Sequence, residues 1–190
     1  MSPLQSAMVI ALAALMACAG ATTVDAPRTT AITTMTLTEI EMIMDDVPKS
    51  CPITKPPDHP FIPPAPYPAE TGSDSFWFGN ERLWTMVRAD GTWKGLPHYT
   101  PDDPTFRQKL FWWRQGYNVR TEPQPKLTVT GTRLGSSAPP LVLADRASNG
   151  WVQADQPFMV VGINLPTLGC WKITAHYKGE ELSFIVWVAQ

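Results

Sequence analysis

The chain has 190 residues and a formal net charge of −2, with a sequence pI near 5.9, so it carries no basic field of the kind that holds nucleic acid. Hydrophobic residues make up 44% of the chain, which supports one domain with a core and flanking segments. The 20 prolines and 8 tryptophans indicate an extended, loop-rich architecture without long helices.

Residues 1–21 have the features of a signal peptide. The apolar run at residues 8–17 has the length of a signal core and is too short to span a bilayer. Two forms of processing remain open. Leu15-Met16-Ala17-Cys18 resembles a lipoprotein motif, in which the signal ends at residue 17 and Cys18 is lipidated, whereas Ala19-Gly20-Ala21 fits ordinary cleavage. We therefore expect an exported protein of the cell envelope, either anchored in the membrane by lipid or free in the periplasm or outside the cell.

Two segments separate the signal from the folded domain. Residues 22–47 are rich in threonine and end in an acidic stretch, so we interpret them as a flexible tether. For residues 39–46 a short amphipathic turn or an edge strand is the alternative, and periodicity does not decide between them. Residues 48–74 are rich in proline, which excludes helix and central strand and predicts an extended arm. Phe61, Ile62 and Tyr67 give this arm an apolar face, so we expect it to pack on the domain.

The cysteines predict one disulfide. If Cys18 is lipidated or removed, Cys51 and Cys170 remain, and an even pair in an exported protein indicates a bridge. Such a bridge would close a loop of about 120 residues and contribute about 4–5 kcal/mol on the chain-entropy model. The alternative is two buried free thiols.

The C-terminal stretch contains the clearest strand pattern. Residues 171–177 alternate apolar and polar side chains, Lys178-Gly179 predicts a tight turn, and residues 182–188 resume the alternation. Because an isolated hairpin is marginal in water, it must lie against a second sheet. We therefore expect the other strands to pack around this hairpin.

Residues 75–163 supply further short strands. Residues 76–87 predict two strands on either side of Gly79-Asn80, and residues 127–134, 141–144 and 156–163 predict three more, with residues 147–150 as a linker. With the hairpin this gives about seven short strands at the intervals of a sandwich. The sequence predicts an all-β, immunoglobulin-like sandwich over residues 75–190.

Signatures of catalysis are missing. The sequence contains no zinc-protease, redox, serine-hydrolase or phosphate-loop motif, so we predict no catalytic residues and no cofactor. Cys170 and His176 lie about 20 Å apart if they share one strand, so they cannot hold a metal together. A hydrolase or carbohydrate-active enzyme that uses His98, Asp102 and Asp103 is an alternative, although Asp in this proline-rich setting is also typical of a turn.

Aromatic side chains give a better candidate site. Adjacent tryptophans on an extended chain point to opposite faces, so we expect Trp112 or Trp113 to meet solvent. With Trp93, Tyr99 and Arg114 they could form a platform for sugar rings or for a partner protein. The alternative is that these rings cover the ends of the sandwich.

Several motifs resemble those of an uncharacterised family of exported bacterial proteins. The motifs are Trp112-Trp113-Arg114, the segments at 127–134 and 138–141, the Pro-Thr-x-Gly-Cys-Trp-x-Ile-Thr pattern at 166–174 and Cys51-Pro-Ile-Thr54. The resemblance covers residues 51–190, with Lys172 at a position where an acid is more usual. It implies an immunoglobulin-like fold and a lipoprotein signal, and it implies no reaction.

Together these observations predict a non-enzymatic binding or structural module. Its expected partners are the membrane, through a lipid on Cys18, and a protein or glycan that the sequence does not identify. A carbohydrate-binding module that uses exposed tryptophans is the main alternative. Nucleic acid is not expected as a partner.

Overall fold

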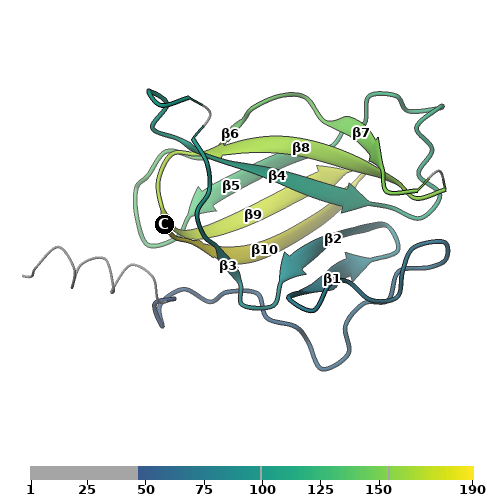
Figure 1. The fold of residues 1–190 in the computed structure, drawn as a ribbon, viewed down its shortest axis with the longest axis horizontal. Helices are drawn as coiled ribbons and strands as arrows, with labels where there is room; N and C mark the ends of the chain where they lie inside the picture. The colour runs from purple at the N-terminus through teal and green to yellow at the C-terminus, as the bar shows by residue number, and fades with distance from the viewer. Residues whose placement is uncertain (1–46, 99, 154) are drawn as a thin grey trace, which may run out of the picture. The chain divides into compact units, whose positions relative to one another are not determined.

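Ten β-strands form two sheets in the computed structural model, which describes residues 47–98, 100–153 and 155–190 (Figure 1). The described residues contain no helix. The strands are β1 (Ser75–Asn80), β2 (Leu83–Arg88), β3 (Thr92–Trp93), β4 (Phe106–Trp113), β5 (Thr128–Arg133), β6 (Val142–Leu143), β7 (Ser148–Trp151), β8 (Pro157–Leu165), β9 (Gly169–Tyr177) and β10 (Glu180–Val188). The expectation of an all-β chain is confirmed.

The six-stranded sheet has the order β1-β2-β4-β8-β6, with β7 also paired to β8, and the four-stranded sheet has the order β3-β10-β9-β5. The pairs are antiparallel except for β10 and β3, which run parallel. Side chains from both sheets meet in one large apolar core. The two sheets therefore form a sandwich rather than a closed barrel.

The terminal hairpin forms as the alternation predicts. β9 and β10 pair from Glu180 opposite Tyr177 to Val188 opposite Gly169. Lys178 has a φ of 49° and Gly179 a φ of 85°, the left-handed pair that a two-residue hairpin turn requires. The apolar side chains of the hairpin that face the other sheet are almost completely buried: Trp171, Ile173, Ala175, Tyr177, Val186 and Val188.

Two local expectations are wrong. The turn between the first two strands lies at Glu81 and Arg82 rather than at Gly79-Asn80, because Asn80 pairs with Leu83. The expected linker at residues 147–150 instead contributes β7, which pairs with β8. The Asn149-Gly150 dipeptide is typical of a turn, but Gly150 serves packing here, since a Cβ on it would lie 2.4 Å from the Phe158 ring.

The proline-rich arm (residues 48–74) covers part of the outer face of the six-stranded sheet. Trp77, Trp84 and Trp113 form a second buried cluster on that face, and Phe61 and Tyr67 of the arm pack against it. The ring centroids of Phe61 and Tyr67 lie 5.6 and 5.3 Å from that of Trp84. The arm therefore adds a third layer, in which aromatic rings replace a regular strand.

Candidate functional site

The three tryptophans of the predicted aromatic platform are buried. Trp93 and Trp112 belong to the main core, and Trp113 belongs to the cluster under the arm, with exposed fractions of 7%, 0% and 5%. The expectation that Trp112 or Trp113 meets solvent is wrong, because Trp112 faces the main core and the rings of Trp77, Phe111 and Phe158 pack around Trp113. Stacked ligands need an exposed ring face, so these three residues offer no platform. Tyr99 lies outside the described residues.

Arg114 takes part in packing at one end of the sandwich. Its guanidinium carbon lies 5.8 Å from the centre of the Tyr177 ring, and Lys178 Nζ lies 5.3 Å from the same centre. Contacts of this kind attract the cation to the electron-rich face of the ring. Arg114 therefore stabilises the end of the β9–β10 hairpin.

A polar network joins the loop between β4 and β5 to this hairpin. The Tyr177 hydroxyl donates a hydrogen bond of 2.7 Å to Glu122 Oε2, and Lys178 Nζ lies 2.6 Å from the same oxygen. The Tyr117 hydroxyl bonds Asn149 Oδ1, and Asn149 Nδ2 donates to the Pro123 carbonyl at 2.7 Å. The network links the loop to both sheets, since Asn149 belongs to β7 and Tyr177 to β9.

Burial and hydrogen bonding shift the pKa values in this network. Burial, followed by the charge of Glu122, raises the pKa of Tyr117 to about 12. Burial and the hydrogen bond to Glu122 raise the pKa of Tyr177. Burial alone would raise the pKa of Glu122, but hydrogen bonds from Lys178, Tyr177 and the Lys126 amide and the charge of Lys178 lower it overall. The network is therefore formed by an ionised carboxylate and neutral phenols near neutral pH.

His98, Asp102 and Asp103 lie on one loop, but their described contacts serve a turn. His98 Nδ1 lies 3.0 Å from the Thr105 carbonyl oxygen, and the His98 ring packs on Phe106 with centroids 4.8 Å apart. The Thr105 amide and hydroxyl donate to Asp103 Oδ1 at 2.8 and 2.7 Å, and these hydrogen bonds lower the pKa of Asp103. Asp102 is exposed. A general acid needs a raised pKa, so the geometry gives no support to a hydrolase.

The predicted Cys51–Cys170 disulfide is present. Its Cα atoms lie 5.6 Å apart across a sequence separation of 119 residues, and both cysteines are buried. Beside it the Thr54 amide donates to the Ile185 carbonyl at 2.9 Å, and the Ile185 amide donates to Thr54 Oγ1 at 2.8 Å. The disulfide therefore holds the start of the arm against the β9–β10 hairpin.

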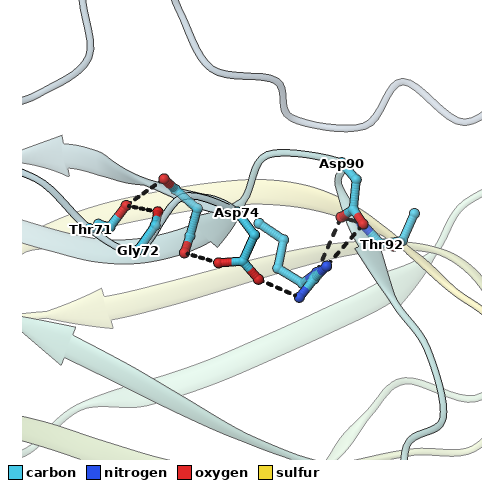
Figure 2. Close-up of polar contacts among 7 residues, drawn as sticks. Thr71, Gly72, Asp74, Asp90 and Thr92 are labelled. Atoms are coloured by element: carbon cyan, nitrogen blue, oxygen red, sulfur yellow. Dashed lines mark hydrogen bonds and ion pairs between the residues drawn. The ribbon is translucent and has the colours of Figure 1, made fainter.

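The other end of the arm is fixed by a chain of polar contacts (Figure 2). Thr71 Oγ1 donates to the Ser75 carbonyl, and the Ser75 hydroxyl donates to Asp74 Oδ1 at 3.1 Å. Arg88 bridges Asp74 and Asp90 with contacts of 2.9 and 3.1 Å. The hydrogen bond from Arg88 is the main cause that lowers the pKa of Asp90 to about 2. These groups are exposed, so the contacts fix geometry more than they add stability.

Trp151 is a candidate contact residue that the sequence did not single out. It ends β7 with an exposed fraction of 55%, and Val152 beside it is 69% exposed. The arm braces the base of this hairpin, since the Tyr67 hydroxyl donates to the Pro157 carbonyl at 3.0 Å and Gln156 Nε2 donates to the Pro66 carbonyl at 2.8 Å. Nothing in the sequence indicated that β7 pairs with β8, and it is this pairing that places Trp151 outside the core.

The described residues contain neither a metal-binding cluster nor a membrane-spanning helix. No group of three His, Cys, Asp or Glu side chains in this part of the chain could hold a metal ion. None of the described residues forms a helix long and apolar enough to cross a membrane.

Comparisons with known proteins give little identity information. No family model and no curated protein match the chain. One solved structure that matches it is described as "X-ray Crystal Structure of a Putative Lipoprotein from Bacillus anthracis". That match has 13% sequence identity and a TM-score of 0.35, and it covers 77% of this chain and 91% of that chain.

Proposed function

We propose that the chain is an exported, non-enzymatic binding or structural module of the cell envelope. The observation that carries the proposal is the buried Cys51–Cys170 bridge. Disulfides persist in oxidising compartments, and a cytosolic protein would keep these thiols reduced. The signal-like sequence at residues 1–21 supports the same address.

The proposed fold type is immunoglobulin-like, and the strand order supports it. In such domains strands A, B, E and D form one sheet and C, F and G the other. Here β2-β4-β8-β6 stand in the first order and β5-β9-β10 in the second. β1 adds an extra strand beside β2, and the disulfide joins the arm to β9 instead of crossing between the sheets.

Intact-mass analysis of the purified protein tests the proposed address. A mass that begins at Cys18 with an added diacylglycerol supports a lipid anchor in the membrane. A mass that begins after Ala21 supports export without an anchor. A mass that retains residues 1–17 contradicts export by either route.

A second candidate function is glycan binding through Trp151. An exposed indole on a braced hairpin can stack on the apolar face of a sugar ring, and Gln153 and Asp155 on the same turn supply polar groups. We expect a glycan array to show binding that Trp151→Ala removes and that Met86→Ala, an exposed change on β2, leaves in place. A silent array contradicts this candidate and leaves the first proposal standing.

A further inference from the structure

Strand β1 has one edge without a strand beside it. In the six-stranded sheet its strand neighbour among the described residues is β2 alone. Asn80 pairs with Leu83 directly across a two-residue turn, so alternate residues of β1 direct their N–H and C=O groups away from β2. These outward-facing residues are Ser75, Trp77 and Gly79. An unpaired edge of this kind can pair with the backbone of another chain.

The arm bonds the beginning of this edge. The Ser75 amide donates to the Gly72 carbonyl at 3.2 Å, and Thr71 Oγ1 donates to the Ser75 carbonyl. The next two outward-facing residues, Trp77 and Gly79, line a cavity instead. Their backbone groups are therefore the ones that another strand can reach.

Three neighbouring cavities follow this edge and form a groove. The first, of about 450 Å³, lies between the arm near Ile62 and residues 75–77 of β1. The second, of about 420 Å³, lies between the arm near His59 and residues 77–80. The third, of about 480 Å³, lies at the turn between β1 and β2. Phe61 lines all three cavities, so the groove follows β1 over its length of about 20 Å.

The chemistry of the groove favours a peptide as its ligand. The edge of β1 presents N–H and C=O groups in the alternation that the backbone of an extended peptide matches. Phe61, Ile62 and Trp77 supply apolar side chains beside this edge, and Ile62 is 67% exposed. An extended peptide uses both features, since its backbone bonds the edge and its alternate side chains contact the walls.

The charges at the two ends of the groove favour a basic peptide. Glu70 lines the first cavity and Glu81 lines the third, so a carboxylate lies at each end. Arg82 also lines the third cavity, but its guanidinium is paired with Glu180 at 3.0 Å. Carboxylates therefore outnumber guanidinium groups along the groove, which attracts Lys or Arg side chains at the ends of a bound peptide.

We propose that the groove beside β1 binds an extended segment of a partner protein as an additional strand, and that this segment carries a basic residue at each end. The backbone of Trp77 and Gly79 bonds its middle, and Ile62 contacts its apolar side chains. Glu70 and Glu81 bind its basic ends. The inference rests on the proposed role as a binding module and names its class of partner. Its failure leaves the proposed export standing, which the intact mass tests separately.

Titration of the isotope-labelled chain with the synthetic peptide Lys-Val-Thr-Val-Thr-Val-Lys, followed by NMR, tests the proposal. We expect the amide resonances of Trp77 and Gly79 to shift. A peptide with Glu in place of both Lys residues should bind about 10-fold more weakly. Glu70→Lys with Glu81→Lys reverses this preference. The control Asp102→Lys with Asp145→Lys makes the same change in net charge at exposed positions outside the groove lining, and it leaves the preference unchanged.

Methylation of the peptide backbone distinguishes strand pairing from general attraction. An extended peptide bonds a sheet edge through alternate residues, so N-methyl groups on one alternate set of amides abolish binding and those on the other set do not. Ile62→Ser weakens binding of the unmodified peptide. Val142→Ser leaves it unchanged, since Val142 is similarly exposed but lies on β6.

Four results would overturn the proposal. The first is the absence of shifts at Trp77 and Gly79 at about 1 mM peptide. The second is an equal effect of the two N-methylation patterns, which contradicts strand pairing. The third is equal affinity for the basic and the acidic peptide. The fourth is dimerisation of the chain without peptide, with shifts of the same amides, which makes a second copy the occupant. Melting curves establish that each variant is folded.

Discussion

At the scale of single residues, burial differs widely among the tryptophans: most are buried in the two clusters, Trp187 is half-buried and Trp151 is exposed. Trp84 is fully buried under the arm, whereas Met86, two positions along β2 on the same face, is 44% exposed. The difference arises from the arm, which covers one end of this face and leaves the other open. Identical strand geometry therefore gives neighbouring side chains very different energetic roles.

Truncation of Trp84 tests that difference. Trp84→Ala removes a large ring between Phe61, Tyr67 and the sheet, so we expect a loss of about 3–5 kcal/mol in the free energy of unfolding. Met86→Ala removes a half-exposed chain from the same strand and should cost less than about 1 kcal/mol. Urea denaturation of both variants provides the measurement. Equal losses would show that the arm does not cover Trp84.

The ionised carboxylate of Glu122 is expected to make the stability of the fold depend on pH. Its pKa is lowered in the folded state by hydrogen bonds from Lys178, Tyr177 and the Lys126 amide, which outweigh burial. The stability that this carboxylate contributes is therefore present above its unfolded pKa, near 4.5, and is lost as pH falls through the lower folded value. We expect Glu122→Gln to be less stable than the unchanged chain at pH 7 and to lose less stability on acidification. Denaturation midpoints between pH 3 and pH 7 measure this. Parallel pH profiles would contradict the role of Glu122.

At the scale of elements, the disulfide fixes the arm where hydrogen bonds are few. The arm contains no regular strand, and its described contacts to the sandwich are ring packing, a few hydrogen bonds and the Cys51–Cys170 bridge. Fixed φ angles at its prolines reduce the conformational entropy that docking removes. The Cys51–Cys170 disulfide and the restricted backbone of the prolines therefore keep the arm in place.

Removal of the Cys51–Cys170 disulfide tests this view. We expect Cys51→Ala with Cys170→Ala to lower the free energy of unfolding by about 2–5 kcal/mol, because the bridge closes a long loop. Dithiothreitol should destabilise the unchanged chain by a similar amount and leave the double variant unaffected. If the reductant destabilised both proteins equally, its effect would not come from this bridge.

The elements that could be predicted from sequence are those with one buried face. β9 alternates cleanly because polar side chains occupy its outer face, and the two turn residues that follow it adopt left-handed angles. β4 could not be assigned in the same way, since Phe111 and Trp113 on its outer face are also covered. The alternation of Trp112 and Trp113 was inferred correctly. The prediction that one of these two side chains meets solvent was wrong, because rings from neighbouring strands, Trp77 and Phe158, pack on Trp113 at the outer face.

The candidate site was less predictable than the fold. Trp151 gave no signal, since Asn149-Gly150 before it has the composition of a turn, and only its pairing with β8 reveals a strand. His98 and Asp103 were candidate catalytic residues because they are titratable and close in sequence. In the structure both contact Thr105 in a way that supports a turn. The composition of a segment indicates which chemistry it could perform. Whether its side chains are exposed depends on segments that are distant in the sequence and pack over them.

At the scale of the whole described domain, three layers are stacked. The four-stranded sheet packs on the six-stranded sheet through the main core, and the arm packs on the far side through a smaller aromatic cluster. The Cys51–Cys170 disulfide fixes one end of the arm, and the polar contacts of Asp74 with Arg88 fix the other. The second candidate function, glycan binding, would use this layered block as a rigid support for the Trp151 hairpin.

The layering is tested most directly by nuclear Overhauser effects in the unchanged protein. We predict cross-peaks from the ring protons of Phe61 and Tyr67 to the indole protons of Trp84, since the ring centroids are 5.6 and 5.3 Å apart. Absence of both sets of cross-peaks, with the β9–β10 contacts intact, would contradict the third layer.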